Sequence, residues 1–116
     1  MHELSIALSL IDAAAEEAEQ LGGPRVQAVH LRLGPLSGVE AEPLASAFAL
    51  ARSGSAIDGA ELVIESVPLV VWCPSCQVEQ TLPTPQPLLC PACGTPTPEV
   101  RSGRELELVA LEVVDP

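Results

Sequence analysis

Four cysteines in the second half of the chain form two pairs, and their spacing restricts the fold more than any other feature. "CPSC" supplies Cys73 and Cys76, thirteen residues follow, and "CPAC" supplies Cys90 and Cys93. A gap of two residues lets both thiolates of a pair turn toward one point, and two such pairs complete a tetrahedral shell of four sulfurs. The pattern predicts a structural metal site with no open position for a catalytic water.

The segment that carries the cysteines is also rich in proline. Such a density of proline disfavours helix and central strand, so we expect a small module without a hydrophobic core of its own. The bound metal would then hold the module together, and Gly94 would serve the tight turn that follows the second pair. The prolines of residues 73–98 are Pro74, Pro83, Pro85, Pro87, Pro91, Pro96 and Pro98.

Zinc is the metal that four thiolates at this spacing favour, and two alternatives stay open. Iron also accepts a shell of four sulfurs, in a rubredoxin-like or iron–sulfur site. A redox role for the CxxC pairs is the other alternative, although neither pair lies in a thioredoxin-like βαβ pattern. In a reducing compartment the cysteines are better interpreted as thiolates than as disulfides.

The charge of the chain restricts its partners. Sixteen acidic and five basic residues give a formal net charge of -11, and the loop between the cysteine pairs contains no lysine or arginine. These features argue against a nucleic-acid surface and favour proteins or cations as partners. No basic leader or membrane-length apolar run is present, so we expect a soluble cytosolic protein. We also expect no enzyme, since no nucleophile–base pair or glycine-rich phosphate loop is apparent.

Periodicity predicts a helix over residues 4–21, a strand over 26–33 and a second helix after Pro43. Residues 60–72 are expected to form a long β segment interrupted at Pro68, and residues 104–114 a final strand. Gly22, Gly23 and Pro24 should end the first helix. The apolar stripe expected on that helix consists of Leu4, Leu8, Ile11, Ala15 and Ala18, and the buried face of the first strand of Val29, Leu31 and Leu33.

The chain begins "MHEL", which places a histidine directly after Met1. The amine of Met1, the amide nitrogen of His2 and its imidazole Nδ1 can wrap one small cation in adjacent chelate rings. Ni(II) accepts nitrogen donors of this kind. Taken alone, a histidine near a terminus is usually just solvated. His30 falls on the less apolar face of the first strand and is expected to be a partly exposed sheet residue.

Several stretches together identify a family. "MHELS", "LRLGPLSGVE", "AFA", "GAELVIE", "CPSC" with "CPACG", and "SGRELEL" occur in this order along the chain. In order and spacing they resemble the hydrogenase nickel metallochaperone family of the HypA/HybF type, over essentially the whole sequence.

The resemblance implies an α+β fold. Two helices would lie on a small three-stranded sheet in a nickel-binding domain of residues 1–72 and 104–116, with a four-cysteine zinc ribbon of residues 73–103 inserted. It implies nickel ligation by His2 with the Met1 amine and nearby amides. Glu3 matches an acid of the family, and Glu40 falls where an acid often precedes the second helix.

The resemblance also implies a function. Ni(II) would be delivered to the large subunit of [NiFe]-hydrogenase together with the GTPase HypB, and in some organisms to urease. The alternative is a zinc-ribbon adaptor that docks proteins without delivering metal.

Overall fold

The computed structural model describes residues 2–114, so Met1 lies outside the described residues. The chain divides into two compact units. Unit 1 contains residues up to Leu31 together with Val39–Glu65 and the segment from Glu107. Unit 2 contains Arg32–Gly38 and Ser66–Leu106.

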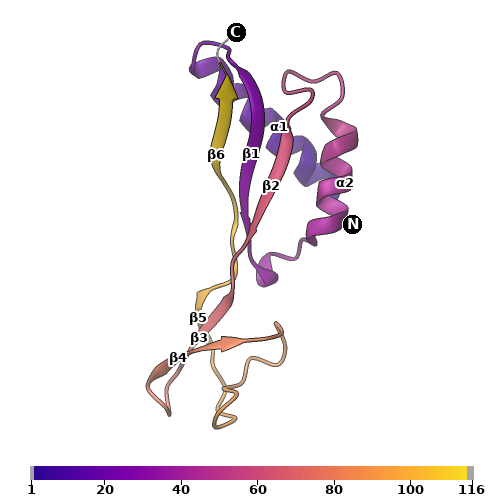
Figure 1. Cartoon of the computed structure of the whole chain (residues 1–116). Helices are drawn as coiled ribbons and strands as arrows, with labels where there is room; N and C mark the ends of the chain where they lie inside the picture. The colour runs from indigo at the N-terminus through magenta and orange to yellow at the C-terminus, as the bar shows by residue number, and fades with distance from the viewer. Residues whose placement is uncertain (1, 115–116) are drawn as a thin grey trace. The chain divides into compact units, whose positions relative to one another are not determined.

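Unit 1 consists of two helices packed on a three-stranded sheet, as expected (Figure 1). The sheet order is β2-β1-β6, so the first strand along the chain is the central one. Helices α1 and α2 contact each other and enclose a core of aliphatic residues around Phe48. The elements are α1 (Glu3–Gln20), β1 (Arg25–Leu33), α2 (Ala41–Ala51), β2 (Glu61–Ser66) and β6 (Leu106–Val114).

The position of α1 was predicted correctly, and its buried face only in part. Ile11 and Ala18 are buried as expected, whereas Leu4 and Leu8 are 57% and 48% exposed, respectively. The other buried residues are Ala7, Leu10 and Ala14. Apolar side chains occur on more than one face of this helix, and the face with small alanines allows the closer packing. Gly22 and Gly23 adopt positive φ after the helix, as a helix end of this kind requires.

The central strand follows its expected pattern. Val29, Leu31 and Leu33 are buried, whereas His30 and Arg32 are partly exposed. The His30 imidazole lies 3.3 Å from the carboxylate of Glu112, at the Nε2 and Oε1 atoms. This pair links β1 to the neighbouring strand β6.

Unit 2 contains a second three-stranded sheet, with the order β4-β3-β5 (Figure 1). Strand β3 is antiparallel to both neighbours, pairing Val71 with Gln80 on one side and Val71 with Val100 on the other. The guanidinium of Arg101 lies 4.9 Å from the ring centre of Trp72 and forms an ion pair with Glu99 at 2.9 Å. The elements are the 3-10 turn η1 (Pro35–Ser37), β3 (Leu69–Cys73), β4 (Val78–Leu82) and β5 (Glu99–Ser102).

The β segment of residues 60–72 is interrupted at Pro68, as expected, and the strands on either side, β2 and β3, belong to different sheets. The expectation of no hydrophobic core needs correction, because unit 2 has a small hydrophobic cluster formed by Leu69, Val71 and Leu82, with Leu36, Leu88 and Val100 packed against it. Most of these residues lie outside the cysteine segment, so the composition of residues 73–98 alone could not predict the cluster.

The helices of residues 2–114 include none with the length and apolar character that a membrane crossing demands.

Candidate metal centre

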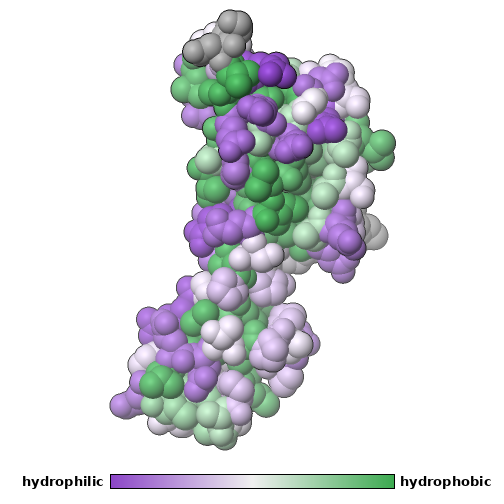
Figure 2. Space-filling model, viewed as in Figure 1, coloured by the Kyte–Doolittle hydropathy of each residue, from purple (hydrophilic) through white to green (hydrophobic). Residues whose placement is uncertain are grey.

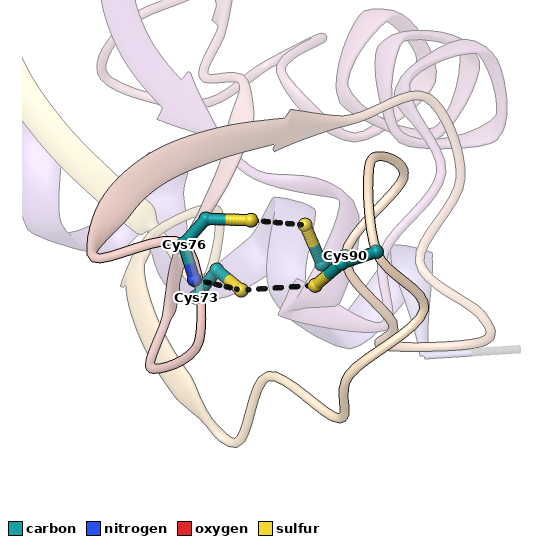
Figure 3. A group of neighbouring side chains, drawn as sticks. Cys73, Cys76 and Cys90 are labelled. Atoms are coloured by element: carbon teal, nitrogen blue, oxygen red, sulfur yellow. Dashed lines mark hydrogen bonds between the residues drawn. The ribbon is translucent and has the colours of Figure 1, made fainter.

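The four cysteines lie together in unit 2. Cys73 is the last residue of β3, Cys76 lies in the turn before β4, and Cys90 and Cys93 belong to a second turn before β5. Their sulfur atoms all lie within 4.8 Å of one another. Figure 3 shows sulfurs from the two turns pointing toward one another, with Cys76 facing Cys90. Cys73 and Cys90 are buried, and Cys76 and Cys93 are exposed.

The sulfur separations fit a tetrahedral metal. A zinc ion bound at ~2.3 Å by four sulfurs places each pair of sulfurs about 3.8 Å apart. The separation is 3.5 Å between Cys73 and Cys93 and 4.0 Å between Cys76 and Cys90. These values lie on either side of the tetrahedral one, so the donor set and its spacing suit a closed four-thiolate site.

The two cysteine turns share one backbone design. In the first, the amide of Cys76 donates to the sulfur of Cys73 at 3.3 Å, and the amide of Gln77 donates to the carbonyl of Cys73 at 2.8 Å. In the second, the amide of Gly94 donates to the carbonyl of Cys90 at 2.8 Å. The residue after each pair has positive φ, 55° at Gln77 and 75° at Gly94. Gly94 was predicted for its turn, whereas Gln77 is a residue type that gives no such signal.

Hydroxyl groups beside the cysteines tune their charge. A hydrogen bond of 3.2 Å joins the Cys93 sulfur to the Thr95 hydroxyl, which in turn contacts the Ser75 hydroxyl at 3.0 Å. Hydrogen bonds with the hydroxyl and backbone of Thr95 lower the pKa of Cys93 to about 6. Hydrogen bonds with the sulfurs of Cys93 and Cys73 raise the pKa of Cys76 to about 12. The cluster therefore concentrates negative charge on Cys93 and is ready to bind a cation.

The residues expected to bind nickel lie in unit 1. His2 is the N-cap residue of α1, is exposed, and makes no capping hydrogen bond with its side chain. Glu3 is the first residue of that helix, and Glu40 is the N-cap residue of α2. The pKa of Glu3 is lowered by hydrogen bonds, first with the amino group of the chain, then with the Glu3 amide and the Glu40 amide. These interactions bring Glu3 close to the backbone at Glu40.

Comparison with known proteins decides the family. The family model described as "Hydrogenase/urease nickel incorporation, metallochaperone, hypA" matches residues 1–113. The chain belongs to the HypA family.

Relatives across this family agree in length with the chain. A protein of Chloroflexus aurantiacus named "Hydrogenase maturation factor HypA" is 51% identical over 112 residues, which cover 97% of this chain and 98% of the relative. A protein of the same name from a Roseiflexus species is 47% identical over 115 residues, covering 99% of this chain and 94% of the relative.

A solved structure of the family has the same fold. The solution structure of the Ni metallochaperone HypA from Helicobacter pylori matches with a TM-score of 0.68 at 25% sequence identity, and the match covers 100% of both chains. The expected fold of two helices on a small sheet with a four-cysteine module is therefore that of the HypA family.

Proposed function

We propose that this protein is a nickel metallochaperone that binds Ni(II) at its N-terminus and helps to insert it into the large subunit of [NiFe]-hydrogenase. The observation that carries the proposal is the match of the nickel-incorporation family model to residues 1–113. Relatives named hydrogenase maturation factor support the same pathway.

The proposed nickel donors are the His2 imidazole, the Met1 amine and nearby backbone amides. Because the N-terminus of a helix carries partial positive charge, a divalent cation there needs anionic groups nearby. Glu3 lies in the first turn of α1, and Glu40 and Glu42 lie at the start of α2. We propose Glu3 as a nickel-site acid and Glu40 as a residue that binds or steers the ion.

Nickel titration by calorimetry tests this assignment with a control that the chain itself provides. The chain has only two histidines. His2→Ala should abolish specific nickel binding, whereas His30→Ala should retain it, because His30 is paired with Glu112 on the sheet. Adding one residue before Met1 should also weaken binding, since it moves the amine out of the chelate. Unchanged nickel affinity in His2→Ala would place the site elsewhere.

The same titration separates the proposal from its alternative. A zinc-ribbon adaptor without metal delivery would bind its protein partners equally well with or without His2. A parent protein that binds no nickel at neutral pH would favour that adaptor.

We propose that Cys73, Cys76, Cys90 and Cys93 hold a structural Zn(II). The closed set of four thiolates and the sulfur separations of 3.5 Å and 4.0 Å support this assignment. Zinc so placed would stabilise the ribbon and leave no site for a substrate. Metal analysis of the purified protein should give one zinc per chain and no iron. Stoichiometric zinc retained by a Cys76→Ser, Cys90→Ser variant would disprove the ligand set.

We propose that the domain of residues 1–72 and 104–116 binds nickel and that the ribbon of residues 73–103 binds zinc. The proposed partners are the GTPase HypB and the hydrogenase large subunit, with binding rather than catalysis as the protein's role. We place this activity in the cytoplasm, where a reducing environment keeps the four cysteines available as thiolates.

A further inference from the structure

Strand β6 (Leu106–Val114) lies at one edge of the unit 1 sheet, with β1 as its neighbour. Its outer backbone groups pair with no other strand of the described chain. Natural sheets protect such edges with proline, lysine, bulges or very short strands. The sequence "LELVALEVV" is nine residues long and contains no proline, glycine or lysine. This edge can therefore accept another strand.

A groove runs along the same edge. It has a volume of about 330 Å³ and is lined by Glu17 and Leu21 at the end of α1 and by Leu108, Val109, Ala110 and Leu111 of β6. Leu21 is 58% exposed and Val109 is 47% exposed. An added strand would lie about 4.8 Å from β6 and would direct alternate side chains to opposite faces. Side chains on one of its faces could cover the apolar part of the groove.

The opposite edge of the sheet is less suitable. Strand β2 has only six residues, and Pro68 follows it closely. In Figure 1, α2 lies on the β2 side of the sheet, and the end of α1 with the turn after it lies on the β6 side. Figure 2 shows hydrophobic residues gathered over the strands of unit 1, bordered by hydrophilic residues. The accessible apolar edge is therefore that of β6.

Charge selects the kind of strand that fits. Helix α1 carries Asp12, Glu16, Glu17 and Glu19 and no basic residue, and β6 carries Glu107 and Glu112. A second copy of the chain would bring another net charge of -11 to this edge and would be repelled. A strand with lysine or arginine between apolar residues would complement both the groove and the carboxylates.

We propose that β6 receives an extended basic segment of a partner protein as a fourth strand of the sheet. Backbone hydrogen bonds along β6 supply the pairing, as in other cases of strand addition. The apolar residues of the segment lie over the groove beside Leu21 and Val109, and its basic residues are attracted by the carboxylates around that edge, Glu17, Glu107 and Glu112. This proposal does not depend on nickel binding, because His2 and the groove lie at opposite ends of α1, an 18-residue helix about 27 Å long.

A nine-residue peptide of alternating valine and lysine is a suitable probe. It should bind the full chain, and amide hydrogen exchange in residues 106–114 should slow by about tenfold or more. The same peptide with alternate backbone nitrogens methylated should not bind, because it lacks the donors for strand pairing. A valine–glutamate peptide should not bind either, because its charge repels the edge.

Two variants of equal charge locate the site. Val109→Lys should weaken the probe's affinity by about tenfold or more. Val63→Lys places the same charge on β2, where Val63 is 39% exposed, and should leave the affinity unchanged. Circular dichroism and zinc content confirm that each variant is folded. Leu21→Lys, on the helix side of the groove, provides a second test that leaves the strand intact.

Four results would overturn the proposal. They are absence of binding by the valine–lysine peptide, binding that persists in both Val109→Lys and Leu21→Lys, exchange protection on β2 instead of β6, and protection of β6 that appears without peptide as protein concentration rises. The last result would show that a second copy occupies the edge. Nickel binding measured on the same samples reports separately on the metallochaperone function.

Discussion

Cys76 and Cys93 hold equivalent places in their two turns, yet their pKa values are shifted in opposite directions. The pKa of Cys76 is raised first by hydrogen bonds with the sulfurs of Cys93 and Cys73, whereas that of Cys93 is lowered first by the residue two positions later. Thr95 forms hydrogen bonds with the Cys93 sulfur, whereas Val78 occupies the corresponding place after Cys76 and has no hydroxyl to offer. The hydrogen bonds with Thr95 therefore favour negative charge on Cys93 over Cys76.

Thr95→Val should weaken zinc binding in acid. Loss of the hydroxyl raises the pKa of Cys93 from its present value of about 6. Because zinc binds the thiolate, a raised pKa makes protons compete at higher pH, so half-release of zinc should move to higher pH. Below the new pKa, affinity should fall about tenfold for each unit by which the pKa rises.

Zinc transfer to a chelator, measured from pH 5 to pH 8, checks this prediction. Thr84→Val is the matched control, because its hydroxyl bonds to the carbonyl of Gln86 in the same module and touches no cysteine. An identical zinc-release profile for Thr95→Val and the parent would show that the hydroxyl does not tune the site.

The sequence predicts the four cysteines of the candidate metal centre, but it does not predict the residues that contact them. The four cysteines could be found because metal ligation imposes a spacing along the chain. Thr95, Ser75 and Gln77 act through backbone conformation and single hydrogen bonds, which leave no periodic signal. Their roles depend on the three-dimensional conformation of the two cysteine turns.

Among the elements, the passage of the chain from β1 into η1 depends on a close backbone approach. The amide of Gly34 donates to the carbonyl of Glu105 at 2.8 Å, and the amide of Leu36 donates to the carbonyl of Gly103 at 2.7 Å. A Cβ atom at Gly34 would lie 2.2 Å from the carbonyl oxygen of Gly103. Glycine is therefore required here by space and not by a left-handed conformation.

Gly34→Ala should destabilise unit 2 by more than about 2 kcal/mol, because backbone, not a flexible side chain, must move to admit the methyl group. Gly38→Ala is a control four residues away. Gly38 has φ of 80° and open space around its missing Cβ, so its replacement should cost only about 1 kcal/mol from the strained conformation. Urea unfolding of both variants gives the comparison, and equal losses would contradict the steric explanation.

Helices and strands were predicted well where the hydrophobic pattern continues over many residues and where glycine or proline marks the end of the element. Helix α1 follows from its helical period and from Gly22 and Gly23, which end it. Strands β1 and β6 follow from their runs of apolar residues at alternating positions. The buried face of α1 followed only in part, because its apolar residues form more than one stripe, and packing selected the one with more alanine. Strands β4 and β5 were not predicted, because both strands are short and most of their residues are polar.

For the whole molecule, the two units differ in what stabilises them. Among the described residues, unit 1 has a core of twelve buried residues around Phe48, whereas the cluster of unit 2 has three. Metal binding must therefore contribute a larger share of the folding free energy of unit 2.

Removal of zinc with a strong chelator should unfold β3, β4 and β5 while helical circular dichroism persists. Hydrogen exchange resolved along the chain measures this, with fast exchange expected at Leu69–Cys73 and retained protection in α1 and α2. Readdition of zinc should restore the protection. Loss of helix together with the ribbon would show that the two units fold as one.

The charge of the whole chain predicts indifference to nucleic acid. With a net charge of -11 and a loop between the cysteine pairs that lacks lysine and arginine, the protein should bind DNA or RNA more weakly than the ~1–100 μM of ordinary non-specific binding. Fluorescence anisotropy with labelled duplex and single strands is a direct assay. Micromolar binding that weakens with added salt would refute the expectation.

The stacking of Arg101 on Trp72 gives the protein an intrinsic optical reporter. Trp72 is the only tryptophan, tyrosine is absent, and the ring stands next to Cys73 on β3. Fluorescence excited at the long-wavelength edge of aromatic absorption therefore comes from Trp72 alone. Its cationic neighbour, Arg101, lies on β5 of the ribbon. Loss of the ribbon's order would release that ring to water and shift its emission to longer wavelength, so the state of the module can be followed in unlabelled protein.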